Sequence, residues 1–288
     1  MENGITERQN EERSINLLAA QRQLYNEVKR VNGIGVLFAV FIPLVLAVVQ
    51  LIIENETLSA VSYVASITSM FIALGVSAYV KNEKKLAAEV QQHFDIYVYQ
   101  IQWDTKLFGK MRDVTHCVME KSKKLYMKSG EREKLIDWYT SPVGLVELKK
   151  GILLCQKENF HWDVSLRKRY KTFCIIIIGV LTVAILALGV IKNESTCMLL
   201  YRFAFIVPMV QWLFQIVVQI NDDVVNLMEC DELLNSSATK TMNELQEIQG
   251  KIYNHRKSCL AIPNWFYERY KDNDEDTAHR SAAMNNTN

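Results

Sequence analysis

The chain has 288 residues, enough for one large domain or two small ones. Its 33 Lys and Arg balance 32 Asp and Glu, and the net charge of +1 excludes a global field that would attract a nucleic-acid polymer. Its 6 cysteines are scattered without a C-x-x-C pair, which argues against a disulfide framework or a zinc site, and the sequence predicts no metal ion or other cofactor.

The N-terminal part predicts a helix followed by a transmembrane hairpin. Residues 1–32 are polar and predict a cytoplasmic amphipathic helix. Residues 33–53 contain no charged side chain and match the roughly 20 residues that span a bilayer. Residues 57–80 are also uncharged. The sequence therefore predicts transmembrane hairpin one over residues 33–80.

The middle of the chain, residues 81–172, predicts a cytoplasmic helical domain with little β structure. Pro142 follows a serine, a pattern typical of a helix start, and predicts a helix to about Asn159. A separate helix over residues 163–171 is expected to lead into the next apolar run.

The C-terminal part predicts a second hairpin and a polar tail. Residues 173–191 are the least polar run, and residues 197–220 follow after a short turn, so residues 173–220 predict transmembrane hairpin two. Residues 221–288 predict a cytoplasmic helical stalk and, beyond Tyr270, a disordered tail. The predicted fold class is an all-α membrane protein with four transmembrane helices in two hairpins and a cytoplasmic helical domain between them.

The weaker runs could instead be core helices of a soluble fold, but their length disfavours this alternative.

Flanking charges predict the orientation of these spans. Basic residues gather at the ends of the runs that lie away from the turns: Lys29, Arg30, Lys81, Lys84, Lys85, Arg167, Lys168, Arg169 and Lys171. The two turns contain only Lys192. Because basic residues favour the cytoplasmic side, we expect a multi-pass protein with both termini in the cytoplasm.

Polar side chains form a stripe along the last predicted span. Gln211, Gln215 and Gln219 recur at four-residue steps, and Asp222 follows close to the same face. Such groups are costly in lipid unless they face water or protein. One interpretation is a pore wall made by oligomerised copies of this span; the alternative is hydrogen bonding that joins the helices of a static bundle.

A basic and aromatic cluster precedes the third span. Arg167 and Arg169, with Trp162 and Tyr170, have the chemistry to grip phosphates and stack a nucleotide base. The alternative is that the basic residues only anchor the span and set its orientation. Both interpretations stay open at this point.

Catalytic signatures are absent from the sequence. It contains no phosphate-binding G-x-x-x-x-G-K-[ST] loop, no H-E-x-x-H and no G-x-S-x-G. Its histidines are isolated from one another, without metal-ligand spacing: His93, His116, His161, His255 and His279. We therefore predict no catalytic residues and expect that the protein is not an enzyme.

Several motifs carry a family resemblance. They are ITERQNEERSINLLAAQRQLYNEVKRV at 5–31, FDIYVYQIQW at 94–103, WYTSPV at 138–143 and CQKENFHWDVSLRKRY at 155–170. Together they resemble the SMODS-associating four-transmembrane effectors of bacterial cyclic-oligonucleotide anti-phage systems (CBASS), over the chain to about residue 260. The tripeptide Gln102-Trp103-Asp104 departs from the turn expected there.

The resemblance implies a function that composition and periodicity do not give. It implies a homo-oligomer in the bacterial inner membrane that stays inert until a neighbouring nucleotidyltransferase makes a cyclic oligonucleotide, and that then permeabilises the membrane and stops the infected cell. The expected partners are the lipid bilayer and this second messenger. The alternative function is a non-conducting membrane receptor or adaptor that recruits a partner through its cytoplasmic helices.

Overall fold

The computed structural model describes residues 3–42, 45, 46, 49, 56–191, 193, 195–236 and 239–270, and every regular element among them is helical. In chain order the elements are α1 (Ile5–Gln9), α2 (Glu12–Val36), the π-helical turn η1 (Leu37–Phe41), α4 (Glu56–Tyr99), α5 (Thr105–Phe108), α6 (Thr115–Tyr126), the 3₁₀ turns η2 (Glu133–Leu135) and η3 (Ser141–Leu145), α7 (Leu148–Ile191), α8 (Thr196–Asn235) and α9 (Met242–Ser258). Residues 264–270 add a further helical turn. The predicted all-α class is confirmed for these residues.

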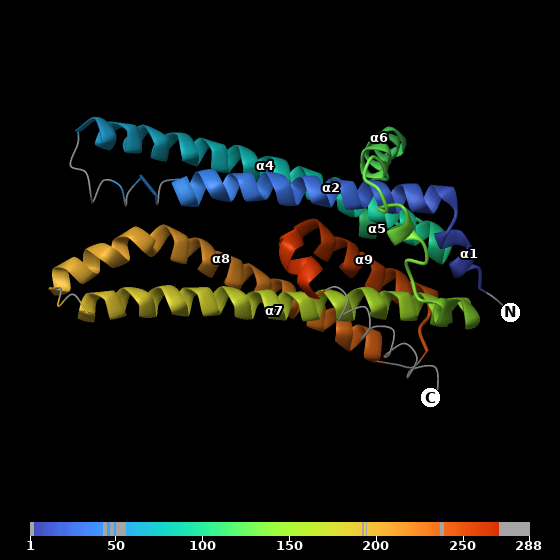
Figure 1. Cartoon of the computed structure of the whole chain (residues 1–288). Helices are drawn as coiled ribbons and strands as arrows, with labels where there is room; N and C mark the ends of the chain where they lie inside the picture. Colours follow the sequence, from blue (N-terminus) through green and yellow to red (C-terminus); the bar gives the residue numbers. More distant parts are fainter. Residues whose placement is uncertain are drawn as a thin grey trace.

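Two long helical hairpins form the frame of the molecule. α2 and η1 pair with α4, and α7 pairs with α8 (Figure 1). The start of α4 and the junction of α7 with α8 lie at the same end of the molecule, while the N-terminus and α1 lie at the other (Figure 1). Among the described residues, α7 alone is long and apolar enough to be recognised as a membrane span. The four-span layout therefore stays a prediction.

The first hairpin is held by a close helix approach. A Cβ atom added at Gly35 of α2 would lie 2.6 Å from Val76 Cγ1 of α4, so only glycine permits this spacing. Towards the hairpin ends, large apolar side chains are exposed; on α4 they are Val61, Val64, Ile67, Met70, Phe71 and Leu74, and on α7 they include Ile176, Val180 and Val183. Exposed apolar surface of this extent is typical of a membrane-facing region.

The middle helices differ from the sequence prediction. Pro142 lies in the 3₁₀ turn η3, and the two helices predicted around Asn159 and over residues 163–171 are one continuous helix, α7. This prediction of two helices was wrong because residues 152–178 contain neither Gly nor Pro, so nothing interrupts the backbone hydrogen bonds. The N-terminal half of α7, which packs in the main core, is thus joined directly to the apolar run by one continuous helix.

The segment after the last apolar run folds back. α8 ends at Asn235, and α9 begins after a capping box in which Thr241 and Glu244 each bind the other's backbone N–H. α9 then packs against α4, α7 and α8 (Figure 1). The tail beyond Tyr270, predicted to be disordered, lies outside the described residues.

The main hydrophobic core lies at the end away from the hairpin junctions. Leu18, Phe94, Ile152, Leu234 and Leu245 are fully buried there and come from five different helices. Burying these side chains fixes α2, α4, α7, α8 and α9 relative to one another. This core positions two buried polar clusters.

Candidate functional site

The first polar cluster surrounds Asp95 of α4, whose side chain is fully buried. Its Oδ1 accepts a hydrogen bond of 2.9 Å from Tyr139 Oη, and its Oδ2 accepts one of 2.9 Å from Gln249 Nε2. Arg256 of α9 also donates to Oδ2 and neutralises the carboxylate. Because a buried unpaired charge is costly, these three donors make Asp95 a strong link between α4 and α9.

Further hydrogen bonds extend this Asp95 cluster across the fold. Tyr139 Oη accepts bonds from Tyr99 Oη at 2.7 Å and from Asn159 Nδ2 at 3.0 Å. The backbone of Tyr139 exchanges two bonds with the side-chain amide of Gln9 in α1. Burial and the neighbouring Asp95 carboxylate raise the pKa of Tyr139 well above its ordinary value, so the hydroxyl keeps its proton. The cluster is a structural joint rather than an open binding site.

The second cluster lies further along α7, around Arg167. The guanidinium is buried, with Nε 3.0 Å from Asp163 Oδ1 on the same helix and Nη1 2.6 Å from Asp223 Oδ2 on α8. His255 of α9 places Nε2 2.8 Å from Asp163 Oδ2. Leu260, just after α9, donates its backbone N–H to Asp223 Oδ2 at 2.8 Å and accepts from Arg167 at 3.2 Å through its carbonyl.

The protonation states in this Arg167 cluster follow from burial and ion pairing. Burial alone would raise the pKa of Asp163, but Arg167 and His255 hold it well below its usual range. Burial alone would lower the pKa of His255, but hydrogen bonds with Asp163 and Cys259 raise it to about 9. His255 is therefore a cation at neutral pH, and the cluster pairs two carboxylates with two cations.

The predicted ligand-binding residues do not share one open surface. Arg167 is 3% exposed, and its charge is satisfied by Asp163 and Asp223. Tyr170 is 6% exposed and packs against Phe266. Arg169 lies over the ring of Tyr270, with the guanidinium 5.2 Å from the ring centre. Trp162 lies within α7, and its side chain is outside the described part of the structure. Ligand binding by these residues stays a prediction.

The predicted pore-lining residues do share a surface. Gln211, Gln215, Gln219 and Asp222 are all exposed on one face of α8. The opposite face of the helix carries buried Leu213, Ile216 and Ile220, which pack against α7 and the C-terminal segment. The side chains of Gln211 and Gln215 thus lie on the exposed face of the folded chain, whereas the Gln219 amide donates to the backbone carbonyl of Ser258 at 3.4 Å. Their role in a pore is untested.

Comparisons with known proteins agree on one family. A family model described as the SMODS-associating 4TM effector domain matches residues 3–284. The chain belongs to this family. A relative from Bacillus cereus (strain VD146), described as a "Probable CBASS effector molecule", is 24% identical over 289 residues, which cover 94% of this chain and 95% of the relative. No solved structure matches the chain.

The motifs that carry the resemblance to the 4TM effector family meet in the two polar clusters. Asp95 and Tyr99 come from the 94–103 motif, and Tyr139 comes from the 138–143 motif. Asn159 in the Asp95 cluster and Arg167 in its own cluster both come from the 155–170 motif. The polar residues of these motifs therefore act in holding helices together.

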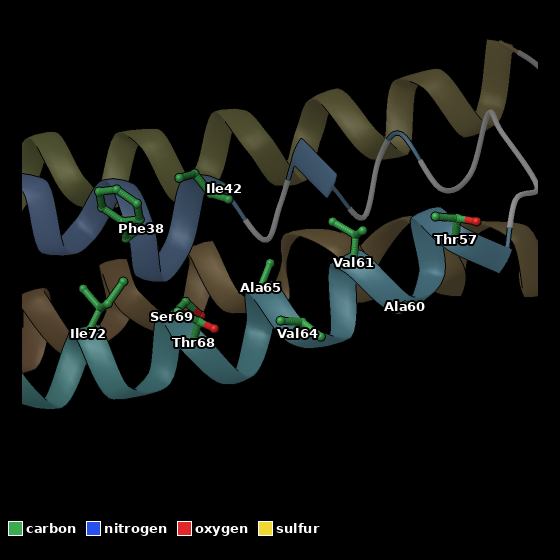
Figure 2. Close-up of a pocket in the computed structure, with 10 residues that line it drawn as sticks. All are labelled: Phe38, Ile42, Thr57, Ala60, Val61, Val64, Ala65, Thr68, Ser69 and Ile72. Atoms are coloured by element: carbon green, nitrogen blue, oxygen red, sulfur yellow. The ribbon is translucent and has the colours of Figure 1, made fainter.

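The first hairpin also contains an apolar groove. Its volume is about 490 Å³. Figure 2 shows Phe38 and Ile42 on one wall and side chains of α4, including Val64 and Thr68, on the other. The lining residues that the structure describes are uncharged, so they offer no cation to a nucleotide phosphate.

Three members of the Arg167 cluster were missed at the sequence level: Asp223 and the backbone of Leu260, which contact Arg167, and His255, which contacts Asp163. Asp223 was visible only as an acidic residue after the last span, and His255 only as an isolated histidine. Their separation from Arg167 in the sequence left no local signal. Among the described residues, no three His, Cys, Asp or Glu side chains come together as a metal site would require.

Proposed function

We propose that this protein is a membrane effector of anti-phage signalling that a cyclic oligonucleotide activates to permeabilise the bacterial inner membrane. Membership of the SMODS-associating 4TM effector family supports the effector role. The description of the Bacillus cereus relative supports a place in CBASS. Activation by the messenger and pore formation are the parts that the experiments below test.

The proposed topology has four spans in two hairpins, with both termini in the cytoplasm. It is supported by the exposed apolar surfaces of α4 and α7, which water would disfavour. The polar links Lys171–Asn221 and Arg167–Asp223 lie at one level of hairpin two, and apolar helix surface follows them. This level marks the cytoplasmic boundary of the bilayer in our proposal.

The observation that carries the pore proposal is the exposed glutamine face of α8. Gln211 and Gln215 lie inside the proposed span, and their amides have no favourable interaction with acyl chains. A homo-oligomer that turns this face inward supplies water to the amides and leaves the buried face of α8 packed on α7. The glutamines would then line the conducting path, with Asp222 at its cytoplasmic mouth.

We further propose that the messenger binds beside residues 162–170. Arg169 offers a cation near the membrane surface, and Trp162 lies two turns earlier on the same helix. Arg167 can contribute only if the phosphate replaces one of its carboxylate partners, Asp163 or Asp223. Such an exchange would connect messenger binding to the contact between α7 and α8.

The function is tested in bacteria that express the full chain together with a cyclic-oligonucleotide synthase. We expect uptake of a membrane-impermeant dye only when both proteins are present and the synthase is active. A synthase with its catalytic carboxylates replaced is the control. Growth arrest with an intact membrane would contradict permeabilisation and favour a non-conducting receptor that recruits a partner.

The messenger site is tested by titration calorimetry with a panel of cyclic di- and trinucleotides. We expect Arg169→Ala to weaken binding by at least about tenfold, the effect of losing a charge-assisted contact. Lys149→Ala, an exposed basic residue at the start of α7, should leave the affinity unchanged. Undiminished binding by the Arg169 variant would contradict the proposed site.

A further inference from the structure

The short segment after α9 touches both hairpins. Residues 258–270 leave the end of α9 and run between the hairpins at the level of the Arg167 cluster (Figure 1). We define this segment as the strap. The sequence predicts a helical stalk for this part of the chain that could pack against the N-terminal helix.

The strap is fixed to hairpin two by hydrogen bonds to the backbone of Leu260 and by burial of the Phe266 ring. Arg167 and Asp223 bind the carbonyl and the N–H of Leu260, so an ion pair between α7 and α8 holds one backbone unit from both sides. Phe266 is 1% exposed, and its ring centre lies 4.9 Å from that of Tyr170. The ring is buried with Cys174, and with side chains of α8, where the apolar run of α7 begins.

The same strap is fixed to hairpin one by hydrogen bonds. Lys29 of α2 donates to Asn264 Oδ1 at 2.7 Å, and Asn264 Nδ2 donates to Asn26 Oδ1 at 2.9 Å. Lys84 of α4 donates to the backbone carbonyls of Ser258 at 3.1 Å and Cys259 at 2.9 Å. The strap therefore joins helices from both hairpins through side chains on each side.

The strap is held less strongly on the hairpin-one side than on the hairpin-two side, as expected of a segment that can detach. The bonds on the hairpin-one side are single hydrogen bonds made by the side chains of Lys29, Lys84 and Asn264. The strap has only one short helical turn, over residues 264–270, and Trp265 within it is 56% exposed. Phe266 and Ile262 are the strap side chains that are buried in the apolar cluster with α7 and α8.

We propose that the strap is a detachable tie that holds the two hairpins together at the cytoplasmic membrane boundary, and that its release lets them separate. In the proposed effector, separation would expose the faces through which chains associate. That regulatory consequence rests on the proposed function, whereas the tie itself does not.

The tie is tested by the distance between the hairpins in the full chain. Spin labels carried by unnatural amino acids at exposed Lys81 on α4 and exposed Lys168 on α7 report this distance in detergent or nanodiscs. We expect Phe266→Ala to lengthen and broaden the distance distribution. Hydrogen exchange of the amides at 260–270 should accelerate by about a hundredfold, because a buried ring is lost.

Two further variants separate release of the strap from a general loss of stability. Phe108→Ala removes a comparably buried ring outside the strap, and it should leave the label distance unchanged. Leu260→Pro removes the N–H that Asp223 binds and should act in the same direction as Phe266→Ala without opening a cavity. The proposal is overturned if exchange shows a released strap while the label distance stays the same, or if neither strap variant releases the segment.

The regulatory consequence has a separate readout. Dye uptake by cells that express Phe266→Ala without any synthase should exceed that of wild type. If the label distance increases but dye uptake stays at the wild-type level, the strap ties the hairpins but does not restrain permeabilisation. If wild type also fails to permeabilise when an active synthase is present, the proposed function itself is wrong.

Discussion

Arg167 of α7 and Asp223 of α8 form a buried ion pair of 2.6 Å, and the two side chains together clasp the backbone of Leu260. Arg167 lies in the same helix as the apolar run of α7, just before that run begins. A change at Arg167 is therefore transmitted along α7 without a flexible joint. The predictions below follow from this arrangement and from the exposed face of α8.

Arg167→Ala should be strongly destabilising. The substitution leaves the carboxylates of Asp163 and Asp223 without their guanidinium partner, and breaking such a buried pair costs about 3–5 kcal/mol. Thermal unfolding in detergent measures the effect. Lys168→Ala, the exposed neighbour, should change the free energy of unfolding by no more than about 0.5 kcal/mol. Equal effects of the two substitutions would contradict the buried ion pair.

Tyr139→Phe should loosen the Asp95 cluster. Loss of the hydroxyl removes a donor to Asp95 and the acceptor that Tyr99 and Asn159 use, with an expected cost of about 1–3 kcal/mol. Tyr97→Phe is the matched control, because its hydroxyl binds Glu11 at the surface. Urea or thermal unfolding that showed no difference between the two variants would count against the cluster.

His255 should make stability fall with rising pH. Its pKa is raised from about 6.5 in the unfolded chain to about 9 in the fold, so its contribution is complete below pH 6.5 and is lost as the pH rises through 9. At about 1.4 kcal/mol for each unit of pKa, the contribution is at most about 3 kcal/mol. The groups that face His255 are Asp163 and Arg167 on α7 and Cys259 after α9.

The pH prediction is measured as a difference between two proteins. Burial raises the pKa of the Cys259 thiol, but Arg167 and a hydrogen bond with His255 lower it below its ordinary value, so both proteins should carry Cys259→Ser, and one should also carry His255→Gln. The melting temperature of the protein that keeps His255 should fall more steeply between pH 6.5 and 9 than that of the double variant. Parallel curves would be inconsistent with a raised pKa at His255.

Gln215→Leu should block permeation without unfolding the protein. The side chain is exposed on the proposed lumen face, so leucine removes a group that interacts with water in the pore and creates no buried cavity. Leakage of a dye from proteoliposomes in the presence of the active messenger measures the effect. Gln102→Leu, at an exposed position just after α4, should leak like wild type. Full leakage through the Gln215 variant would argue against a lining role for α8.

The helical class and the two hairpins could be predicted from the sequence, but the packing of the hairpins at the end that holds the main core could not. The length of residues 33–53 and 173–191 and their lack of charge are enough to predict them as spans, because these properties can be read from each segment alone. Arg167, in contrast, resembles any basic residue before a span, because its neutralisation depends on Asp223 and Asp163 and on the return of the chain at Leu260. Tertiary contacts of such sequence separation leave no periodic signal.

The helix boundaries also depend on tertiary packing that the sequence pattern does not reveal. Pro142 and its preceding serine are typical of an α-helix start, yet packing places them in the 3₁₀ turn η3 and delays the long helix to Leu148. Phe266 has no periodic partner in the sequence, and its burial arises from the fold of residues 258–270 between the hairpins.

Electrical recording from the purified full-length chain in a planar lipid bilayer tests the central claim most directly. We predict that addition of its cyclic oligonucleotide produces discrete ionic conductance, and that Gln215→Leu abolishes this conductance while the protein still inserts and binds the messenger. A chain that binds the messenger in the bilayer and carries no current would contradict the proposed pore.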